Sequence, residues 1–423
     1  REKAFYDTLL AVRRALASNA SLIGEAARRL TRSRKALSAR KRRPRSGAPD
    51  ASVIFTGINA ETTPEALRLP PGKAATSRGA LGDALSHLNK LSGGALMGCA
   101  ADLLGSTSVS TLNAGFAAGF HHRARNAGSR LVPAGGICED AMGALMSGLS
   151  SYGRHVGVTS SYSAFIAPLE HVAARLHVIG QEGRRHRTGE AARTWIMINA
   201  HAGPMTGEDG PTHADVHGLQ LLQGNFPAGT LITLTPWEAS EVWPLLAAGF
   251  LARPAVLAPF VTRPAVAVPD RSLLGLPPAS AAAQGVYALR RAPGGATVIL
   301  QGASVTTVFV RDVIPLLDAE GLTLNIYYVA SAELFDALPP ERREDILPAR
   351  LLRSAMMITD FTLPTAQRWL HSAEGTAASL HPFGKGAYLS SGAWESLLAE
   401  GGLDGPSQFE AVRSWRRVID GAR

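Results

Sequence analysis

Short apolar runs that alternate with helix-like segments are the feature of this sequence that most restricts its fold. Three of these runs are TWIMINA (Thr194–Ala200), TLITLT (Thr230–Thr235) and AVLAPFVT (Ala255–Thr262). Each has the length of a buried strand, and polar or charged residues follow each one. Strands that alternate with helices form parallel, doubly wound sheets. No run reaches the roughly 18 uncharged apolar residues of a membrane span, so we expect no membrane segment.

The same pattern occurs twice, which predicts two α/β domains in a chain of 423 residues. We assign residues 74–264 to the first domain and residues 285–423 to the second. The Pro- and Ala-rich stretch 265–284 is predicted to link them. In the second domain the runs ATVILQGAS, LTLNIYYVA and SAMMITDF predict strands, and a final helix is expected from Pro406.

The basic charge of the chain is concentrated at its start. Residues 1–46 hold 14 Lys and Arg against 3 Asp and Glu, although the whole chain carries a net charge of only +9. Phe5, Leu9, Val12 and Leu16 recur at helical spacing and predict a helix with one buried face. We therefore expect a basic helical arm over 1–46, followed by a linker over 47–73.

The densest basic run of the arm is ARKRRPR, Ala39 to Arg45. Such a run can bind nucleic acid, an anionic surface or an acidic partner, and a solvated basic helix is the structural alternative. No aromatic platform or nucleic-acid motif accompanies it, which argues against nucleic acid. Only two cysteines, Cys99 and Cys138, occur, and no secretory signal is visible. These features favour a reducing, cytoplasmic location.

Titratable residues collect where the predicted strands of the first domain end. His201 follows one strand directly, Arg263 follows another, and we expect Glu139 to follow a third. In parallel sheets, ligands bind beyond the carboxyl ends of the strands. Taken alone, Glu139 also suits the first turn of a helix, and Tyr162 and Phe165 also suit a core.

The order of these pieces resembles the transketolase family. The motif GEDGPTH (Gly207–His213) is highly specific to that family, and CEDAMGA, GCAADL and VTR match further family motifs. The resemblance covers about 350 residues, from about Ala74 to the end of the chain. It implies a pyrimidine-binding domain of thiamine diphosphate enzymes followed by a transketolase C-terminal domain.

The resemblance implies a cofactor site for thiamine diphosphate. Glu139 matches the family carboxyl that bonds the aminopyrimidine ring nitrogen and thereby promotes loss of the thiazolium proton. Tyr162 and Phe165 would stack on the pyrimidine ring. Asp102 would lie near the cofactor.

The resemblance also implies a phosphorylated sugar substrate. Asp209 and His213 would contact its hydroxyl groups, and Glu139, His201 and His213 would form the catalytic set. The distal phosphate would be held by a clamp of two arginines, a histidine and a serine. These residues are Arg78, Ser106, His201 and Arg263.

Two departures from the family motifs concern the substrate and the metal. Cys138 and Asp140 replace the Arg and His that flank the family glutamate, and the Asp after the family histidine is Ala202 here. The family motif GDG, which with a later Asn holds the diphosphate and its divalent metal, does not occur in this sequence. We therefore expect no metal ligands in this chain.

The missing motif predicts a split enzyme. A separate subunit would carry the GDG-type domain and hold Mg²⁺ or Ca²⁺, and the two chains would form an α2β2 heterotetramer. Residues 1–46 would contact that partner. Two alternatives remain open at this point: a subunit of an enzyme that decarboxylates 2-oxo acids with the same cofactor, and a regulatory homologue without catalysis. The presence of all four clamp residues favours an enzyme that acts on phosphorylated sugars, because a 2-oxo acid has no distal phosphate.

Overall fold

A computed structural model describes residues 2–41 and 45–421 of the chain. The chain forms two compact units, one reaching from Arg1 to Ala48 and the other from Pro49 to Arg423. Within the basic run of the arm, residues 42–44 lie outside the described residues.

The first unit contains the predicted helix and a second one. Helix α1 spans Glu2–Ser18 and α2 spans Ala20–Ala39, and neither has a buried residue. The prediction that α1 buries its apolar face is therefore wrong for this chain by itself: Phe5 is 68% exposed and Leu16 is 54% exposed. Helical spacing shows that these side chains share a face, but it cannot show what covers that face.

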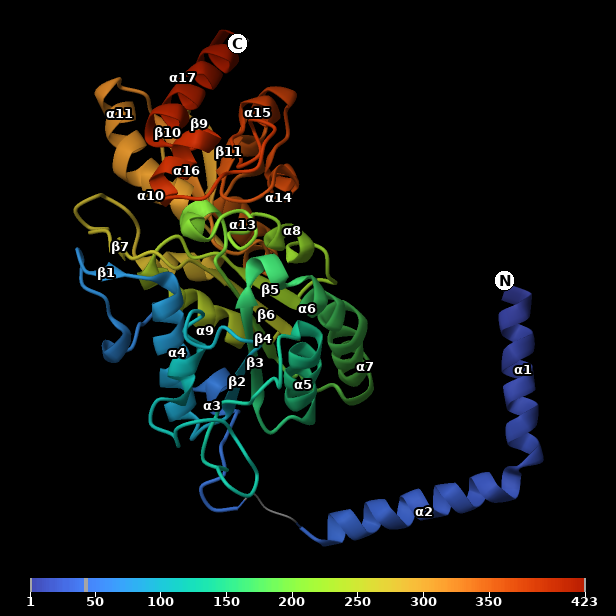
Figure 1. The fold of residues 1–423 in the computed structure, drawn as a ribbon. Helices are drawn as coiled ribbons and strands as arrows, with labels where there is room; N and C mark the ends of the chain where they lie inside the picture. Colours follow the sequence, from blue (N-terminus) through green and yellow to red (C-terminus); the bar gives the residue numbers. More distant parts are fainter. Residues whose placement is uncertain (1, 42–44, 422–423) are drawn as a thin grey trace. The chain divides into compact units, whose positions relative to one another are not determined.

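The second unit begins with a five-stranded parallel sheet, as the sequence predicts (Figure 1). Its three predicted strands appear with their ends shifted by one residue, and β3 was not predicted as a strand. In spatial order the strands are β2 (Leu96–Ala100), β3 (Val156–Tyr162), β4 (Trp195–Ala200), β6 (Val256–Val261) and β5 (Leu231–Leu234).

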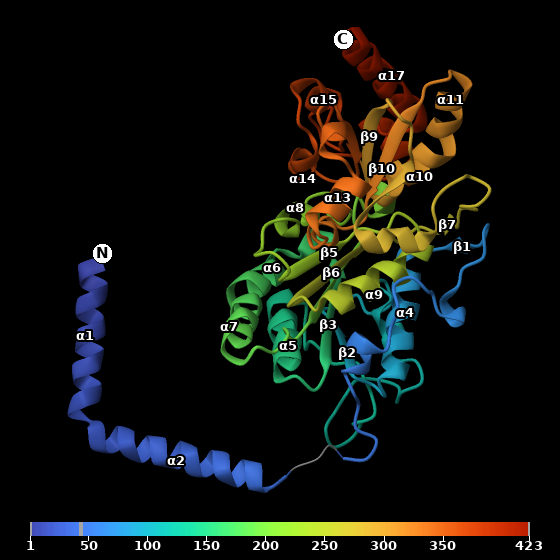
Figure 2. The same ribbon diagram turned by 180° about the vertical axis from the view of Figure 1, so that it is seen from behind.

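Helices cover both faces of this sheet, and they lie on opposite sides of it in both views (Figures 1 and 2). One face packs on α4 (Ser77–Leu91) and α9 (Val242–Ala252); the other packs on α5 (Glu139–Tyr152), α6 (Ala167–Val172) and α7 (Val178–Thr188). Successive strand residues point to opposite faces, so Ile196 and Ile198 join one core while Trp195 and Met197 join the other.

Glu139 does not follow a strand, which corrects the sequence prediction. The apolar residues before it make only a single-residue bridge, between Leu131 and Gly98, and a loop leads on to α5. Glu139 is instead the first residue of α5. A run that is apolar but broken by Pro133 and two glycines lacks the length to add a sixth strand.

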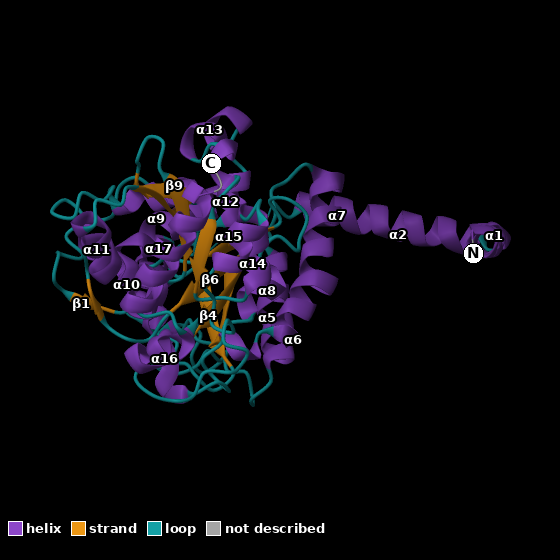
Figure 3. Ribbon diagram, turned by 90° about the horizontal axis from the view of Figure 1, so that it is seen from above, coloured by secondary structure: helices purple, strands orange, loops and turns teal. Residues whose placement is uncertain are grey.

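A second sheet of four strands follows, with helices around both sheets (Figure 3). Strands β9, β10 and β11 are parallel and match the predicted runs, while β8 was not predicted and runs antiparallel to β10. In spatial order they are β11 (Met356–Thr359), β9 (Ala296–Gln301), β10 (Leu324–Val329) and β8 (Val286–Arg290).

Helices cover the second sheet in the same two-sided way, and the predicted final helix is α17 (Gly405–Gly421). The others around it are α10 (Ala303–Val308), α11 (Ile314–Ala319), α12 (Ala332–Asp336), α13 (Pro340–Ile346), α14 (Leu363–Ala366), α15 (Ala373–Ala378) and α16 (Trp394–Gly401). One core cluster contains side chains from both sheets, such as Ile196 and Val298. The two sheets therefore share one hydrophobic interior.

The segment predicted as a linker between the sheets is ordered and packed. Its strand β7 (Val266–Ala267) pairs with β1 (Ala74–Ala75). Its Arg271 is buried and donates to Glu238 Oε1 at 2.9 Å and to Glu241 Oε1 at 2.6 Å. Tyr287 of β8 donates to Glu241 as well. This network joins both sheets and the segment between them.

The residues before the first sheet are also packed. Helix α3 (Val53–Thr56) buries Ile54, and Trp243 of α9 donates its indole hydrogen to the carbonyl oxygens of Asn59 and Thr62 at 3.1 Å each. Composition suggested a linker over 47–73 because Pro and Gly are frequent there. Such residues also occur in segments that are fixed by side chains from elsewhere in the fold.

Arg271→Met is expected to destabilise the second unit by about 3–5 kcal/mol, because it leaves Glu241 and Glu238 buried without their cation. Burial already raises the pKa of Glu241, although the charge of Arg271 opposes the rise. Loss of the cation raises that pKa further, so the variant regains stability as the pH falls and Glu241 takes up a proton. Urea unfolding at pH 8 and pH 6 measures both effects.

The matched control is Arg290→Met, which removes a half-buried surface arginine that pairs with the exposed Asp318 at 2.6 Å. A surface pair contributes about 0–1 kcal/mol. Equal losses in the two variants would contradict a special role for the buried network.

Candidate functional site

Three neighbouring strands end side by side at one edge of the first sheet. Tyr162 is the last residue of β3 and pairs in register with Ala200 of β4, which pairs with Val261 of β6. His201 follows β4 directly, and Arg263 comes two residues after β6. Because parallel strands end at the same edge, Tyr162, His201 and Arg263 lie close together.

His201 is the most confined residue of this edge. Its side chain is 0% exposed, and its ring stacks on that of Tyr162 with centroids 3.6 Å apart. Its backbone has a φ of 58°, a left-handed conformation that costs a non-glycine residue about 1–3 kcal/mol. Nδ1 lies 3.0 Å from Asp209 Oδ2, yet neither ring nitrogen has a partner in hydrogen-bond geometry.

Burial lowers the pKa of His201 to about 4. The carboxylate of Asp209 opposes this shift, while the positive charges of Arg263 and Arg78 and the nearby His213 add to it. The ring is therefore neutral at physiological pH. It has two buried nitrogens available, one as donor and one as acceptor.

Arg263 is held by the loop of the GEDGPTH motif. Its Nη1 donates to both carboxylate oxygens of Asp209, at 3.2 and 3.3 Å, and its Nη2 donates to Glu208 at 2.9 Å. The two carboxylates fix the guanidinium at the end of β6. They also balance its positive charge.

Arg78 lies in the first turn of α4, whose N-cap Thr76 accepts from the backbone of Gly79 at 2.9 Å. Its guanidinium donates to the carbonyl oxygen of Ser106. Burial lowers the pKa of Arg78, and the charge of Arg263 lowers it further. The four residues predicted as a phosphate clamp, including His201, are thus brought together, although the hydroxyl of Ser106 itself donates to Leu103 O at 3.3 Å.

Three rings form an aromatic wall beside the clamp. Tyr162 and Phe165 are nearly parallel, with centroids 6.2 Å apart, and His213 meets both edge-on at 5.9 and 5.3 Å. The hydroxyl of Thr212 lies 2.8 Å from Nδ1 of His213. The sequence left a core position open for Tyr162 and Phe165, and the structure supports it: Tyr162 is buried in the first core cluster and Phe165 packs against that cluster. A short turn after β3 also places both residues at the edge of the sheet.

Glu139 reaches the same edge from the adjacent helix. Helix α5 runs antiparallel to β3; its 14 residues span about 21 Å and the 7 residues of β3 about 23 Å, so the start of one meets the end of the other. Gly157 permits this close packing, because a Cβ there would lie 2.1 Å from the carbonyl oxygen of Met146. As a result Ser161 donates to Glu139 Oε1 at 3.0 Å.

Asp102 is the predicted residue with the fewest contacts. It is exposed in the loop after β2. In the described part of the chain its side chain has no hydrogen bond or ion pair. The structure therefore brings Glu139, Tyr162 and the clamp to one edge but gives Asp102 no contact with them.

Asp215 is a residue of this edge that the sequence analysis missed. It is buried and accepts from the backbone of Gly218 at 2.6 Å and from the hydroxyl of Ser163 at 3.0 Å. It thereby ties the turn between Tyr162 and Phe165 to the residues that follow GEDGPTH. An aspartate three residues before a glycine that opens a helix, α8 (Gly218–Leu222), is a capping pattern that could have identified it.

Two kinds of feature are absent from residues 2–41 and 45–421. None of their helices is long and apolar enough to cross a bilayer. No group of three or more His, Cys, Asp or Glu side chains among them is arranged to hold a metal ion.

The fold and this edge define a class: α/β proteins in which helices cover both faces of a parallel sheet, with a charged and aromatic site at the carboxyl ends of its strands. Residues 73–259 match the family described as "Transketolase, pyrimidine binding domain". Escherichia coli transketolase 2 is 25% identical over 217 residues, which cover 51% of this chain and 30% of that protein. The region 73–259, which holds most of the first sheet and of this edge, thus belongs to the family of transketolase pyrimidine-binding domains.

Solved structures have the same fold. A transketolase from Pichia stipitis in complex with sedoheptulose 7-phosphate matches with a TM-score of 0.66 and 18% identity, over 86% of this chain and 49% of that one. A split-gene transketolase, described as an inactive β4 tetramer, matches with a TM-score of 0.55 and 16% identity, over 80% of this chain and 97% of that one. The matched region thus spans about a third of the curated relative and half of the longer solved chain.

The lowered pKa of His201 predicts that acid destabilises the protein. An unfolded histidine has a pKa near 6.5, so the folded state resists protonation of His201 as the pH falls from about 6.5 to 4. Between pH 7 and pH 5 this group alone should lower the free energy of unfolding by about 2 kcal/mol. His201→Asn should remove that part of the pH dependence. Urea unfolding at both pH values measures it.

The matched control is His171→Asn, which replaces an exposed histidine on α6. This variant should keep the pH dependence of the wild type. If His201→Asn keeps it as well, His201 is not the buried neutral group described above.

Proposed function

We propose that this chain is a subunit of a thiamine diphosphate-dependent, transketolase-like enzyme that transfers a two-carbon ketol unit between phosphorylated sugars. The observation that carries the proposal is the convergence of Glu139, the aromatic wall and the clamp residues on one edge of one sheet. Folds of this kind support many functions, so the argument rests on these side chains rather than on the architecture.

The residues at this edge fit the pyrimidine half of the cofactor. Glu139 is half-buried, and among the described residues Ser161 is its only hydrogen-bond partner. One of its carboxylate oxygens is thus free to bond a ring nitrogen. The rings of Tyr162 and Phe165 lie at the same edge; Phe165 is half-buried, and the buried ring of Tyr162 stacks on His201. A carboxyl beside an aromatic wall suits a flat, weakly basic heterocycle.

Each residue of the site has a physical role in the proposed enzyme. When bound, thiamine diphosphate supplies the nucleophilic carbon for breaking and forming a carbon–carbon bond next to a carbonyl group. Glu139 holds a proton against the pyrimidine ring nitrogen, and Ser161 orients its carboxylate. Tyr162 and Phe165 fix the plane of the ring and exclude water.

The substrate contacts come from the clamp and the GEDGPTH loop. Arg78, Arg263, Ser106 and the neutral ring of His201 would bind the distal phosphate, and Asp209 and His213 would bind hydroxyl groups. A phosphate entering beside Arg263 replaces some of the negative charge that Asp209 and Glu208 now supply. Binding energy from this remote group orients the reacting carbons.

A partner chain is part of the proposal. It would carry the GDG-type domain, hold Mg²⁺ or Ca²⁺ with the diphosphate, and form an α2β2 heterotetramer with this chain. The likeness to 97% of a split-gene transketolase chain supports this reading. Exposed apolar surface on α5 and on the adjoining helices also supports a partner chain. This surface begins next to Glu139. Its exposed side chains are Leu145 (48%), Tyr152 (80%), Leu176 (61%) and Ile179 (59%).

The exposed face of α1 gives the arm a role in the same assembly. Phe5, Leu9, Val12 and Leu16 form an apolar stripe that is exposed within the described part of the first unit. We assign this stripe to contact with the partner chain. A cytoplasmic location remains a prediction from the cysteine content.

Glu139→Gln in the assembled enzyme is expected to slow hydrogen–deuterium exchange at the thiazolium carbon of the cofactor by about 10²–10⁴-fold, because an amide cannot share the proton. Nuclear magnetic resonance after acid quenching measures the exchange. Glu170→Gln, on α6, is the control with the same chemical change and should exchange like the wild type. An unchanged rate in Glu139→Gln would contradict the role assigned to Glu139.

Without its partner, the isolated chain should bind the cofactor weakly.

The variants Arg263→Ala and His201→Ala test whether the substrate is a phosphorylated sugar or a 2-oxo acid. Each should lower kcat/KM for a phosphorylated ketose by about 10–100-fold, because loss of a charged hydrogen bond costs about 1.5–3 kcal/mol. An unphosphorylated ketose should be used as by the wild type. Steady-state kinetics with both ketoses measures the difference, and Arg290→Ala, in the second sheet, is the control.

Equal losses with both ketoses would mean that Arg263 and His201 support the structure or the cofactor instead. If neither variant loses kcat/KM with either ketose, Arg263 and His201 do not bind a phosphate, and an enzyme that acts on 2-oxo acids is favoured. A complex with the cofactor but no turnover of any ketose or oxo acid would favour a regulatory homologue.

A further inference from the structure

The opposite edge of the first sheet carries a second group of basic residues. Arg154 and His155 directly precede β3, Arg193 lies two residues before β4, and Arg253 lies three residues before β6. These strands are neighbours, so the segments that enter them meet at their amino ends. The group is therefore separated from the candidate site by the length of the strands.

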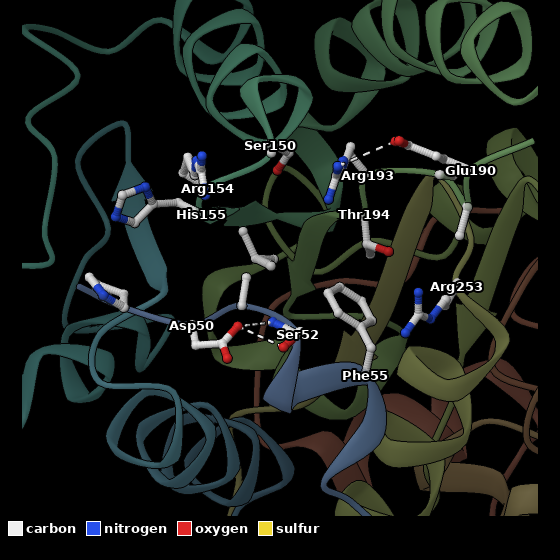
Figure 4. A pocket seen from close by; sticks show the side chains of 16 residues that line it. Asp50, Ser52, Phe55, Ser150, Arg154, His155, Glu190, Arg193, Thr194 and Arg253 are labelled. Carbon is white, nitrogen blue, oxygen red and sulfur yellow. Dashed lines mark hydrogen bonds and ion pairs between the residues drawn. The ribbon is translucent and has the colours of Figure 1, made fainter. Parts of the chain in front are cut away.

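These residues surround a pocket of about 460 Å³ (Figure 4). Figure 4 shows Arg154, His155 and Arg193 along one side and Asp50, Ser52 and Phe55 along the other, with Arg253 at one end. Binding sites for small organic molecules typically occupy about 300–1,000 Å³. The pocket is thus large enough for an organic molecule and much larger than one inorganic ion needs.

The cations of the pocket have few partners, while its acids are already engaged. Asp50 accepts from the backbone and the hydroxyl of Ser52, at 2.9 and 2.7 Å. Glu190 pairs with Arg184 and lies 3.6 Å from Arg193. In the described part of the chain, the side chains of Arg154 and Arg253 have no hydrogen bond or ion pair, and Nε of Arg193 is buried without a hydrogen-bond partner. Positive charge therefore dominates inside the pocket.

The backbone holds two of these arginines in place. Gly153 has a φ of 84°, and a Cβ at that position would lie 2.9 Å from Nε of Arg193. Arg253 has a φ of 51°, which costs a non-glycine residue about 1–3 kcal/mol. Its guanidinium lies 5.2 Å from the ring centre of Phe55. Arg253 is the residue that ends helix α9, where a left-handed backbone is common, and this ending fixes the position from which its side chain reaches the pocket.

We propose that this pocket binds a small organic phosphate that carries more than one negative charge. Arg154 and Arg193 offer donors from one side of the pocket and Arg253 from one end, and guanidinium groups are matched in shape and charge to phosphate. Phe55 supplies apolar surface for the organic part of the ligand. The site is distinct from the phosphate clamp, which lies at the other end of the same strands, and it does not depend on the proposed enzyme activity.

Titration calorimetry with the full chain in about 0.15 M salt tests the proposal, since that salt concentration screens weak surface binding. The probes are inorganic pyrophosphate and ATP, which share the charge but differ in the organic part. Arg154→Gln and Arg253→Gln should each weaken binding by about 10–100-fold, the effect of losing one charged hydrogen bond. Arg253→Lys should weaken it less, because the charge is kept.

Two control variants separate the pocket from other basic surface. Arg290→Gln changes a surface arginine of the second sheet, and the double variant Lys41→Gln/Arg45→Gln reduces the charge of the arm; both should bind like the wild type. Hydrogen exchange with bound ATP should slow at 153–156 and 192–194. The proposal is overturned if the wild type binds neither probe, if the pocket variants bind as tightly as the wild type, or if only the arm variant loses binding.

Discussion

The parallel hydrogen-bonded ladder of β3, β4 and β6 is the constraint on which the candidate site depends. Residues that are about 40 and 60 positions apart in the sequence leave the sheet at the same edge because the register pairs Tyr162 with Ala200 and Ala200 with Val261. His201 then turns sharply, with a left-handed backbone, and its ring packs on Tyr162. The turn places the imidazole among charged side chains, and burial keeps it neutral by lowering its pKa.

The second sheet closes over this edge. Gly203, two residues after His201, lies so close to Asp360 that a Cβ would be 3.0 Å from the Cβ of that residue. Asp360 is buried, and burial raises its pKa to about 6, although it accepts from the backbone of Ser304 at 2.7 Å. Gly210 of the GEDGPTH loop likewise approaches Ser391. The loop that holds Arg263 is therefore positioned by both sheets.

Arginine side chains at the two edges of the first sheet differ in their carboxylate partners. At the carboxyl edge Arg263 is paired with Asp209 and Glu208, whose carboxylates balance its charge. At the amino edge Arg154 and Arg253 have no such carboxylates. Paired arginines suit a site that exchanges substrates, because a departing phosphate leaves no unpaired charge behind. Unpaired arginines suit a ligand that stays bound.

Local pattern was sufficient to predict the α/β class, the three parallel strands of the second sheet and the strands that precede His201 and Arg263. Apolar runs of strand length and residues with distinctive motifs can be read without knowledge of distant contacts. The GEDGPTH motif likewise identified Asp209 and His213 as site residues, and their functions remain proposals. The antiparallel strand β8 was missed because it alternates buried and half-buried residues over only five positions.

Tertiary structure alone decided the remaining features. Glu139 reaches the site through the length match of α5 and β3 and the close packing at Gly157, neither of which a linear pattern contains. The basic pocket forms because three turns meet at one edge. Arg271 binds Glu238, 33 residues away, and Asp215 accepts from Ser163, 52 residues away, as well as from nearby Gly218. The apolar stripe of α1 has the periodicity of a buried face, yet nothing in this chain covers it within the described residues. Periodicity shows which side chains share a face, whereas only the contacts of the folded chain show what that face packs against.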